Sequence, residues 1–215
     1  MFQMRQGPWL FAVVIWASTA STVAEGQEWS LLTGGTMGVK SGALHVQAGW
    51  PSASATLLYG VSPGADLGTV FTFNYAFEGD VILGLKKIGL GFQGMVRARL
   101  YDSNTFNAGL AFAPGVLGYP CDCGSRAVGL LLPLRVAFGY PNGAGGSLFW
   151  AVDLPFFAAG GFSALPVLFG VGQEILITRN LMLTLNAKAG PIFYSFYSGG
   201  IGVGLEATAG LAFRL

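Results

Sequence analysis

Charged residues are scarce in this sequence. Asp, Glu, Lys and Arg make up 10% of the 215 residues, whereas a typical globular protein contains roughly 25%. Hydrophobic residues account for 53%. So few charges cannot cover a surface that faces water, and the composition therefore excludes an ordinary soluble domain and favours a membrane protein.

The chain also has no excess of basic residues. It contains 11 Lys and Arg against 10 Asp and Glu, for a formal net charge of +1. Removal of the first 24 residues would take away one base, Arg5, and leave a formal net charge of 0. A neutral chain without a basic stripe offers no footprint for nucleic acid, so we expect no nucleic-acid partner.

Long apolar segments suited to helices are poorly represented. Residues 154–172 carry no charge and number nineteen, which is long enough to span a bilayer as a helix. The same stretch holds Pro155, Pro166 and four glycines, and each glycine inside a helix costs roughly 0.8 to 1 kcal/mol relative to Ala. A polytopic helical protein is therefore the alternative, and strands are favoured.

Cysteine and histidine are too few for most metal or redox centres. Cys121 and Cys123 are two residues apart, and a disulfide between them would be strained even in an oxidising compartment. Two ligands are also too few for a closed zinc site. We interpret the pair as a local loop feature and expect no metal. Because no phosphate loop or nucleotide fingerprint is present, we expect no cofactor either.

What the sequence does contain begins with an export signal at residues 1–24. Arg5 supplies a positive start, residues 9–17 form an apolar core too short to span a bilayer, and residues 18–24 are small. Cleavage after Ala20 or Ala24 fits this pattern. No cysteine lies at the junction to carry a lipid anchor. Residues 25–42 follow as a periplasmic lead-in or an extra strand.

From residue 43 to the end, the sequence alternates with the period of two that is typical of β-strands. Two such runs flank the polar break at residues 178–180, as in an antiparallel hairpin. One face of each run is bulky and apolar, and the other carries glycine and isolated charges. The pattern predicts ten strands, with eight or twelve as alternatives: 43–50, 55–61, 67–77, 88–101, 106–116, 128–140, 148–156, 165–177, 181–193 and 201–215.

The charges in these runs take the face opposite the bulky residues. A charge that faces lipid costs about 2 to 4 kcal/mol at the bilayer midplane, so we expect this face to line a lumen; a soluble barrel would show the reverse pattern. The expected lumen charges are Arg97, Arg99, Arg135, Asp153, Glu174, Lys188 and Glu206, with Arg214 on the same face, and the expected polar lumen residues are His45, Gln47, Gln93 and Asn186.

In these features the chain resembles bacterial outer-membrane β-barrel proteins. The resemblance covers about residues 43–215 and rests on the signal segment, on hairpin turns such as residues 59–67, and on the terminal strand. It implies an all-β, transmembrane antiparallel up-and-down barrel in the outer membrane of a Gram-negative bacterium. Export across the inner membrane, outer-membrane lipid and the barrel insertion machinery are implied with it. Such chains commonly end on an aromatic residue, whereas this one ends on Leu215.

Three functional hypotheses follow from the sequence. The first is a structural or surface-interaction role, with lumen charges that pair and fill a narrow interior. The second is a narrow, porin-like channel for small solutes. The third and least favoured is a membrane-embedded hydrolase or acyltransferase that uses His45 with Ser41 or Ser52. We interpret His45 as a hydrogen-bonded lumen residue, expect no enzyme activity and assign no catalytic residue.

Turn lengths predict the orientation in the membrane. The turns at residues 62–66, 102–104 and 178–180 are short, which is typical of the periplasmic side, so residues 78–87 and 117–126 should face outward. An epitope inserted beside Cys121 should therefore be labelled on intact cells. Labelling that requires permeabilised cells would reverse this topology.

Overall fold

A computed structural model describes residues 29–75, 88–119, 127–142, 145–159, 162–195 and 200–215. These residues form strands, turns and connecting segments. Among them there is no helix long and apolar enough to cross a membrane. The helical alternative for residues 154–172 is wrong for the described part of that stretch, which is strand except for Val167. The strands are β1 (Gly42–Trp50), β2 (Ser52–Ser62), β3 (Ala65–Asn74), β4 (Gly89–Asp102), β5 (Asn107–Phe112), β6 (Gly115–Tyr119), β7 (Ala127–Pro141), β8 (Gly146–Ala159), β9 (Phe162–Pro166), β10 (Leu168–Thr178), β11 (Leu181–Ser195) and β12 (Gly200–Arg214).

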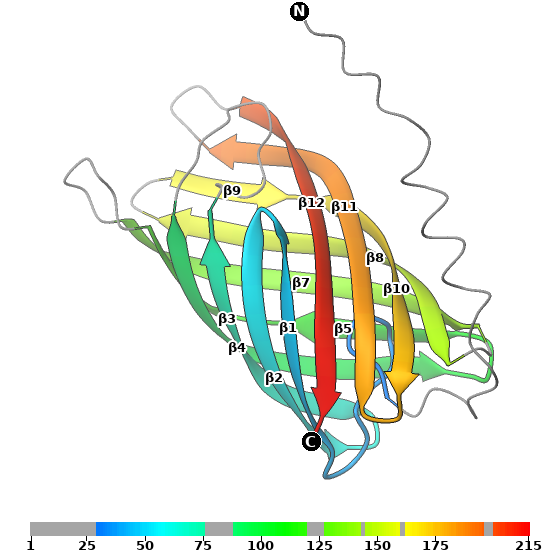
Figure 1. Ribbon diagram of the computed structural model, residues 1–215. Helices are drawn as coiled ribbons and strands as arrows, with labels where there is room; N and C mark the ends of the chain where they lie inside the picture. The colour runs from blue at the N-terminus through cyan, green and yellow to red at the C-terminus, as the bar shows by residue number, and fades with distance from the viewer. Residues whose placement is uncertain (1–28, 76–87, 120–126, 143–144, 160–161, 196–199) are drawn as a thin grey trace, which may run out of the picture.

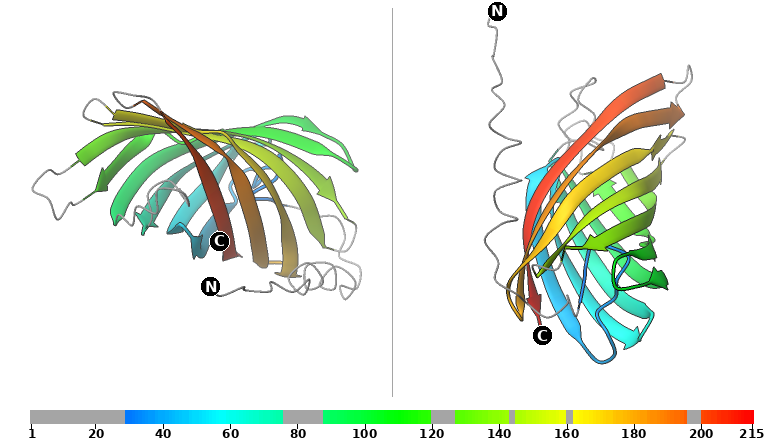
Figure 2. Two further views of the ribbon diagram at one scale, coloured as in Figure 1. Left: turned by 90° about the horizontal axis from the view of Figure 1, so that it is seen from above. Right: turned by 90° about the vertical axis from the view of Figure 1, so that its right-hand side faces the viewer.

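The strands belong to one antiparallel sheet that closes into a barrel of ten strand positions (Figure 1; Figure 2). β12 pairs with β1, which joins the two ends of the chain. β5 and β6 share one position between β4 and β7, and β9 and β10 share another between β8 and β11. Closure removes unpaired strand edges, as a spanning sheet requires in lipid. The prediction of a ten-strand antiparallel barrel is confirmed.

Two of the expected strands are interrupted. The run at 106–116 breaks between β5 and β6, where Pro114 has no N–H to donate to the ladder. The run at 165–177 breaks at Val167, next to Pro166, although the Val167 N–H still donates to the Pro191 carbonyl at 2.9 Å. The expected boundaries also shift, because β2 begins at Ser52 and β3 ends at Asn74.

The outer surface of the barrel is apolar. Alternate side chains along each strand are exposed and hydrophobic, including Phe169 at 63% and Val171 at 64%, while their inward neighbours such as Leu168 are buried. A closed barrel with this exterior is built for contact with lipid. The chain therefore has the architecture of a transmembrane β-barrel, as its alternation predicts.

The two ends of the barrel differ. One end carries the short turns β2–β3, β4–β5 and β10–β11 together with the C terminus, and we call it the turn end. The opposite end, where β1 turns into β2 at Pro51, is called the loop end. Figure 1 places the blue N-terminal segment at the turn end.

Residues 29–41 form no strand. They fold into the barrel, where Trp29 and Met37 are buried at 2% and 0% exposure. Trp29, Leu31 and Met37 belong to a core cluster with the inward-facing Leu58 and Met182. We call residues 29–37 the plug. An inward-folded segment is an arrangement that the lead-in and extra-strand hypotheses did not include.

The alternation can be tested with two adjacent residues at the middle of β7. Leu134 has the parity of the exposed Leu130, and Arg135 lines the lumen. Leu134→Arg should reduce the free energy of unfolding by about 2 to 4 kcal/mol, because it places a charge in lipid. Arg135→Leu should cost less, because Asp153 keeps Lys188 as a partner.

Refolding titrations in lipid vesicles would measure both variants. If Leu134→Arg is as stable as wild type and Arg135→Leu fails to insert, the inward and outward faces have been exchanged.

Candidate functional site

Glu174 of β10 is the strongest attachment point between the barrel wall and the plug. Its carboxylate accepts hydrogen bonds from the N–H groups of Leu31 and Leu32 at 2.7 and 2.6 Å, and from the Ser30 hydroxyl at 2.9 Å. The Glu174 side chain is completely buried. Hydrogen bonds to a buried charged group are among the stronger ones in proteins, so the plug fixes the acid and the acid fixes the plug.

Arg97 of β4 binds backbone carbonyl groups of the plug. Both terminal nitrogens of the guanidinium donate to the Ser30 carbonyl at 3.2 Å, and one of them also donates to the Gly35 carbonyl. On the wall, Arg97 lies 3.7 Å from the buried Asp66 of β3, which accepts the Met37 N–H at 3.0 Å. Acid, base and plug backbone thus form one connected polar network.

Further hydrogen bonds attach the plug to several sides of the turn end. The Thr36 hydroxyl donates to the Pro63 carbonyl at 2.9 Å beside β3, and the Trp29 indole donates to the Arg179 carbonyl at 3.2 Å after β10. Between them, the Gly34 N–H donates to the Asn107 side chain at 2.9 Å. Because β3 and β10 lie on opposite sides of the barrel, the plug spans the lumen.

The backbone of the plug packs directly against the backbone of β5. A Cβ on Gly34 would lie 2.3 Å from the carbonyl carbon of Ala108, and a Cβ on Gly109 would lie 2.8 Å from Gly34 itself. Both distances are shorter than real Cβ contacts, so main chain packs on main chain at this point. Any larger residue at position 34 must push the plug away from β5.

A belt of paired charges runs along the side of the lumen formed by β7 to β12. Lys188 of β11 lies 3.3 Å from Asp153 of β8 and 3.0 Å from Glu206 of β12. Arg135 of β7 lies 3.5 Å from Asp153 and donates to the Leu32 carbonyl of the plug at 3.0 Å. These residues therefore neutralise one another, as the first functional hypothesis supposes.

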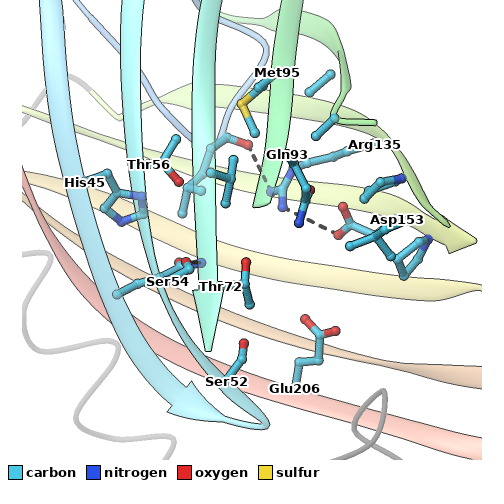
Figure 3. Close-up of a pocket in the computed structure, with 18 of the residues that line it drawn as sticks. His45, Ser52, Ser54, Thr56, Thr72, Gln93, Met95, Arg135, Asp153 and Glu206 are labelled. Carbon is cyan, nitrogen blue, oxygen red and sulfur yellow. Dashed lines mark hydrogen bonds and ion pairs between the residues drawn. The ribbon is translucent and has the colours of Figure 1, made fainter. Parts of the chain in front are cut away.

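A cavity of about 260 Å³ lies on the loop-end side of the plug. Leu31 and Leu32 of the plug form part of its lining, and the lining extends to Pro51, Ser52 and Asn74. Figure 3 shows its side chains converging from several strands. One wall, from β1 to β4, carries Arg97, which is bound to the plug and lies beside Asp66, and otherwise only neutral side chains, several of them polar. The facing wall, from β7, β8, β11 and β12, carries the charge belt.

A second cavity, of about 340 Å³, lies at the turn end. Trp29, Ser30 and Thr36 of the plug line it, and so does Arg99, which forms an ion pair with Asp102 at 2.6 Å. Arg99 thus lies at the rim, apart from the charge belt. No lining residue is common to the two cavities, because the plug lies between them.

The polar residues expected in the lumen lie at separate places. His45 contacts the Thr184 hydroxyl through Nε2 at 2.9 Å, and the Gln47 amide donates to Ser54 at 3.0 Å. Gln93 lines the loop-end cavity, and Oδ1 of Asn186 is buried without a partner among the described residues.

Arg214 and the two cysteines lie apart from these lumen residues in the sequence. Arg214 donates to the Ser41 hydroxyl at 3.2 Å at the turn end. Cys121 and Cys123 lie outside the described residues. Within the described part of the chain, no three His, Cys, Asp or Glu side chains gather as metal ligands would.

Neither the plug nor its partner Asp66 was predicted from the sequence. Asp66 is fully buried, although it is the last residue of the turn expected at residues 62–66. One available signal was parity, because Asp66 shares the inward face of β3 with Thr72. For the plug, small residues at positions 33–36 next to Trp29 and Met37 were compatible with tight packing, but no periodic pattern identified their location.

Comparison with known proteins adds little to this site. No protein-family model matches the chain, and no curated protein sequence matches it. An outer membrane channel from Pseudomonas putida F1 is similar over 90% of this chain and 100% of its own, at 13% identity and a TM-score of 0.43. The attachment invasion locus protein of Yersinia pestis is similar over 81% of this chain and 94% of its own, at 10% identity and a TM-score of 0.22. Likenesses at this level carry no argument about function.

The role of Glu174 can be tested by hydrogen exchange. In Glu174→Ala the N–H groups of Leu31 and Leu32 lose a charged acceptor, so peptides that contain residues 29–37 should exchange at least about tenfold faster. Mass spectrometry of the refolded protein would measure the rates.

Glu206→Ala is the matched control, because Glu206 pairs with Lys188 in the belt. Equal acceleration in both variants, or none in Glu174→Ala, would show that this carboxylate does not hold the plug.

Proposed function

We propose that this protein is a plugged outer-membrane barrel with a structural or surface-interaction role, and that it does not form a permanently open pore. The observation that carries the proposal is the path of the plug. It is attached at Pro63, Arg97, Asn107, Glu174 and Arg179, and these residues belong to opposite sides of the barrel.

Removal of the plug would be costly. Glu174 and Arg97 are buried charged residues whose hydrogen bonds run largely to plug backbone. A hydrogen bond to a charged group contributes about 1.5 to 3 kcal/mol, and a buried charge left without partners is strongly destabilising. We expect the plug to stay in place under equilibrium conditions.

The charge belt also argues against a dedicated ion path. A selective pore offers a ring of like charges to the passing ion, whereas Lys188 here bridges Asp153 and Glu206, and Arg135 shares Asp153. Acids and bases that lie within ion-pair distance of one another leave no single sign of charge along the lumen.

A narrow channel for small solutes is the second candidate, and a specific observation favours it. Cavities of about 260 and 340 Å³ lie on the two sides of the plug. Displacement of the plug would therefore join two spaces that already exist. In this alternative the plug is a gate, and the barrel conducts only when the plug has moved.

A non-enzymatic role is part of the proposal. His45 is within hydrogen-bond distance of the Thr184 hydroxyl, whereas the Ser41 hydroxyl accepts a hydrogen bond from Arg214. Ser41, which the enzyme hypothesis paired with His45, therefore has a different partner. We further propose that residues 1–24 direct export across the inner membrane, that the insertion machinery assembles the barrel in outer-membrane lipid, and that the turn end faces the periplasm.

Single-channel recording in a planar bilayer tests the proposal. The refolded chain should show no sustained conductance, whereas a chain that begins at Ser41, and therefore lacks the plug, should conduct. Sustained wild-type conductance equal to that of the shortened chain would overturn the plugged barrel.

A second variant keeps the full length of the chain. Gly34→Leu should increase channel openings, because a side chain at this position meets the backbone of Ala108. Gly64→Leu is the matched control, since a Cβ on Gly64 meets nothing within 4 Å. A closed Gly34→Leu protein together with a closed chain from Ser41 would show that something other than the plug blocks the lumen.

A further inference from the structure

We propose that the cavity between the plug and the loop end is a binding site for a small uncharged polyhydroxylated molecule, that is, a monosaccharide or a similar polyol. The inference rests on the proposed function in one respect, because the plug must close the turn-end side of the cavity. It adds a ligand class to a barrel whose sequence indicated only a narrow, partly charged interior.

The size of the cavity limits the ligand. At about 260 Å³, it lies just below the range of roughly 300 to 1,000 Å³ that is typical of sites for drug-sized molecules. It is much larger than the space that one bound water needs. A single sugar ring or a short polyol suits this volume, whereas an oligosaccharide or a lipid chain does not.

The wall from β1 to β4 offers hydrogen-bonding groups that the protein leaves unused. Gln93 and Thr56 are 6% and 8% exposed and line the cavity. Thr72 lines it beside them, and within the described part of the chain no hydrogen bond engages any of these three side chains. Buried polar groups are almost always bonded to protein, water or ligand. An amide and two hydroxyls, which can each donate and accept, therefore point to a ligand with the same dual capacity.

The facing wall excludes a ligand with net charge. Its charges are already paired, with Lys188 between Asp153 and Glu206. An anion or a cation would have to break one of these pairs or remain uncompensated in a buried site, and both are costly. A hydroxyl can instead donate to a carboxylate or accept from an ammonium group without disturbing the ion pairs. This wall thus favours a neutral ligand that makes many hydrogen bonds.

Among the described residues, the lining of the cavity extends toward the loop end of the barrel. Leu31 and Leu32 lie at its plug side, and its lining reaches Pro51, Ser52 and Asn74 at the loop end. On another side, Leu117 and Leu131 belong to a buried apolar cluster with Phe157. Figure 3 shows Ser52, Ser54 and Thr72 along the side that leads toward the loop end. We infer that the ligand enters and leaves through the loop end.

Calorimetric titration of the refolded full-length barrel with D-glucose tests the proposal. We expect saturable binding. Thr72→Val and Gln93→Ala should each weaken binding by about two- to tenfold, the effect of one lost hydrogen bond. Thr69→Val is the matched control, because Thr69 is on the same strand but on the exposed outer face, and its affinity should equal that of wild type.

Several outcomes would overturn the site. One is the absence of glucose binding by folded protein, which would show that the cavity holds only water. A difference in gel mobility between unheated and heated samples would show that the barrel is folded. Another is tighter binding of inorganic phosphate or glycine than of glucose, which would show that the cavity selects ligands with ionised groups. Equal losses in Thr72→Val and Thr69→Val would place binding elsewhere.

The same protein separates this inference from the plugged barrel. Saturable glucose binding together with sustained conductance would retain the site and reject the plug as a permanent closure. A closed barrel without glucose binding would reject the site and retain the plug.

Discussion

The structure depends on one constraint, which is that hydrocarbon offers no partner to a charge or to a backbone amide. The constraint requires the sheet to close, so β12 returns to pair with β1. It also decides which side chains face inward, because strands alternate and charges must avoid lipid. A barrel of ten positions has little interior space, and the inward charges therefore lie close enough to interact with one another.

The plug supplies hydrogen-bond partners to buried charges of the barrel wall. Lys188, Asp153, Glu206 and Arg135 can neutralise one another along one side of the lumen, but Glu174 receives its closest described bonds from two plug amides and the Ser30 hydroxyl. The plug backbone supplies donors to this acid and acceptors to Arg97. It thus completes the hydrogen bonding of the wall while it closes the lumen, so closure and stability are coupled.

The two sides of the lumen consequently have different properties. From β7 to β12, Arg135, Asp153, Lys188 and Glu206 form ion pairs, and Arg135 and Glu174 also bind the plug. From β1 to β4, the side chains around the cavity are neutral except for Arg97, and Gln93 is buried without a described protein partner. The ion pairs of the belt lie on the first side, and the uncharged hydrogen-bonding side chains that face the cavity are concentrated on the second.

The sequence by itself determined the fold and the parity of each strand, because the cost of a charge in lipid acts residue by residue and leaves a period of two in the chain. Arg135 and Leu134 can be assigned to opposite faces from that period alone. The breaks at Pro114 and Val167, the burial of Asp66 and the position of residues 29–37 depended on tertiary structure. The physical reason is that the plug has no periodic pattern, and its partners, from Asp66 to Glu174, are distant in sequence. Only closure of the barrel brings those partners around one lumen, and only then does the segment have a place to bind.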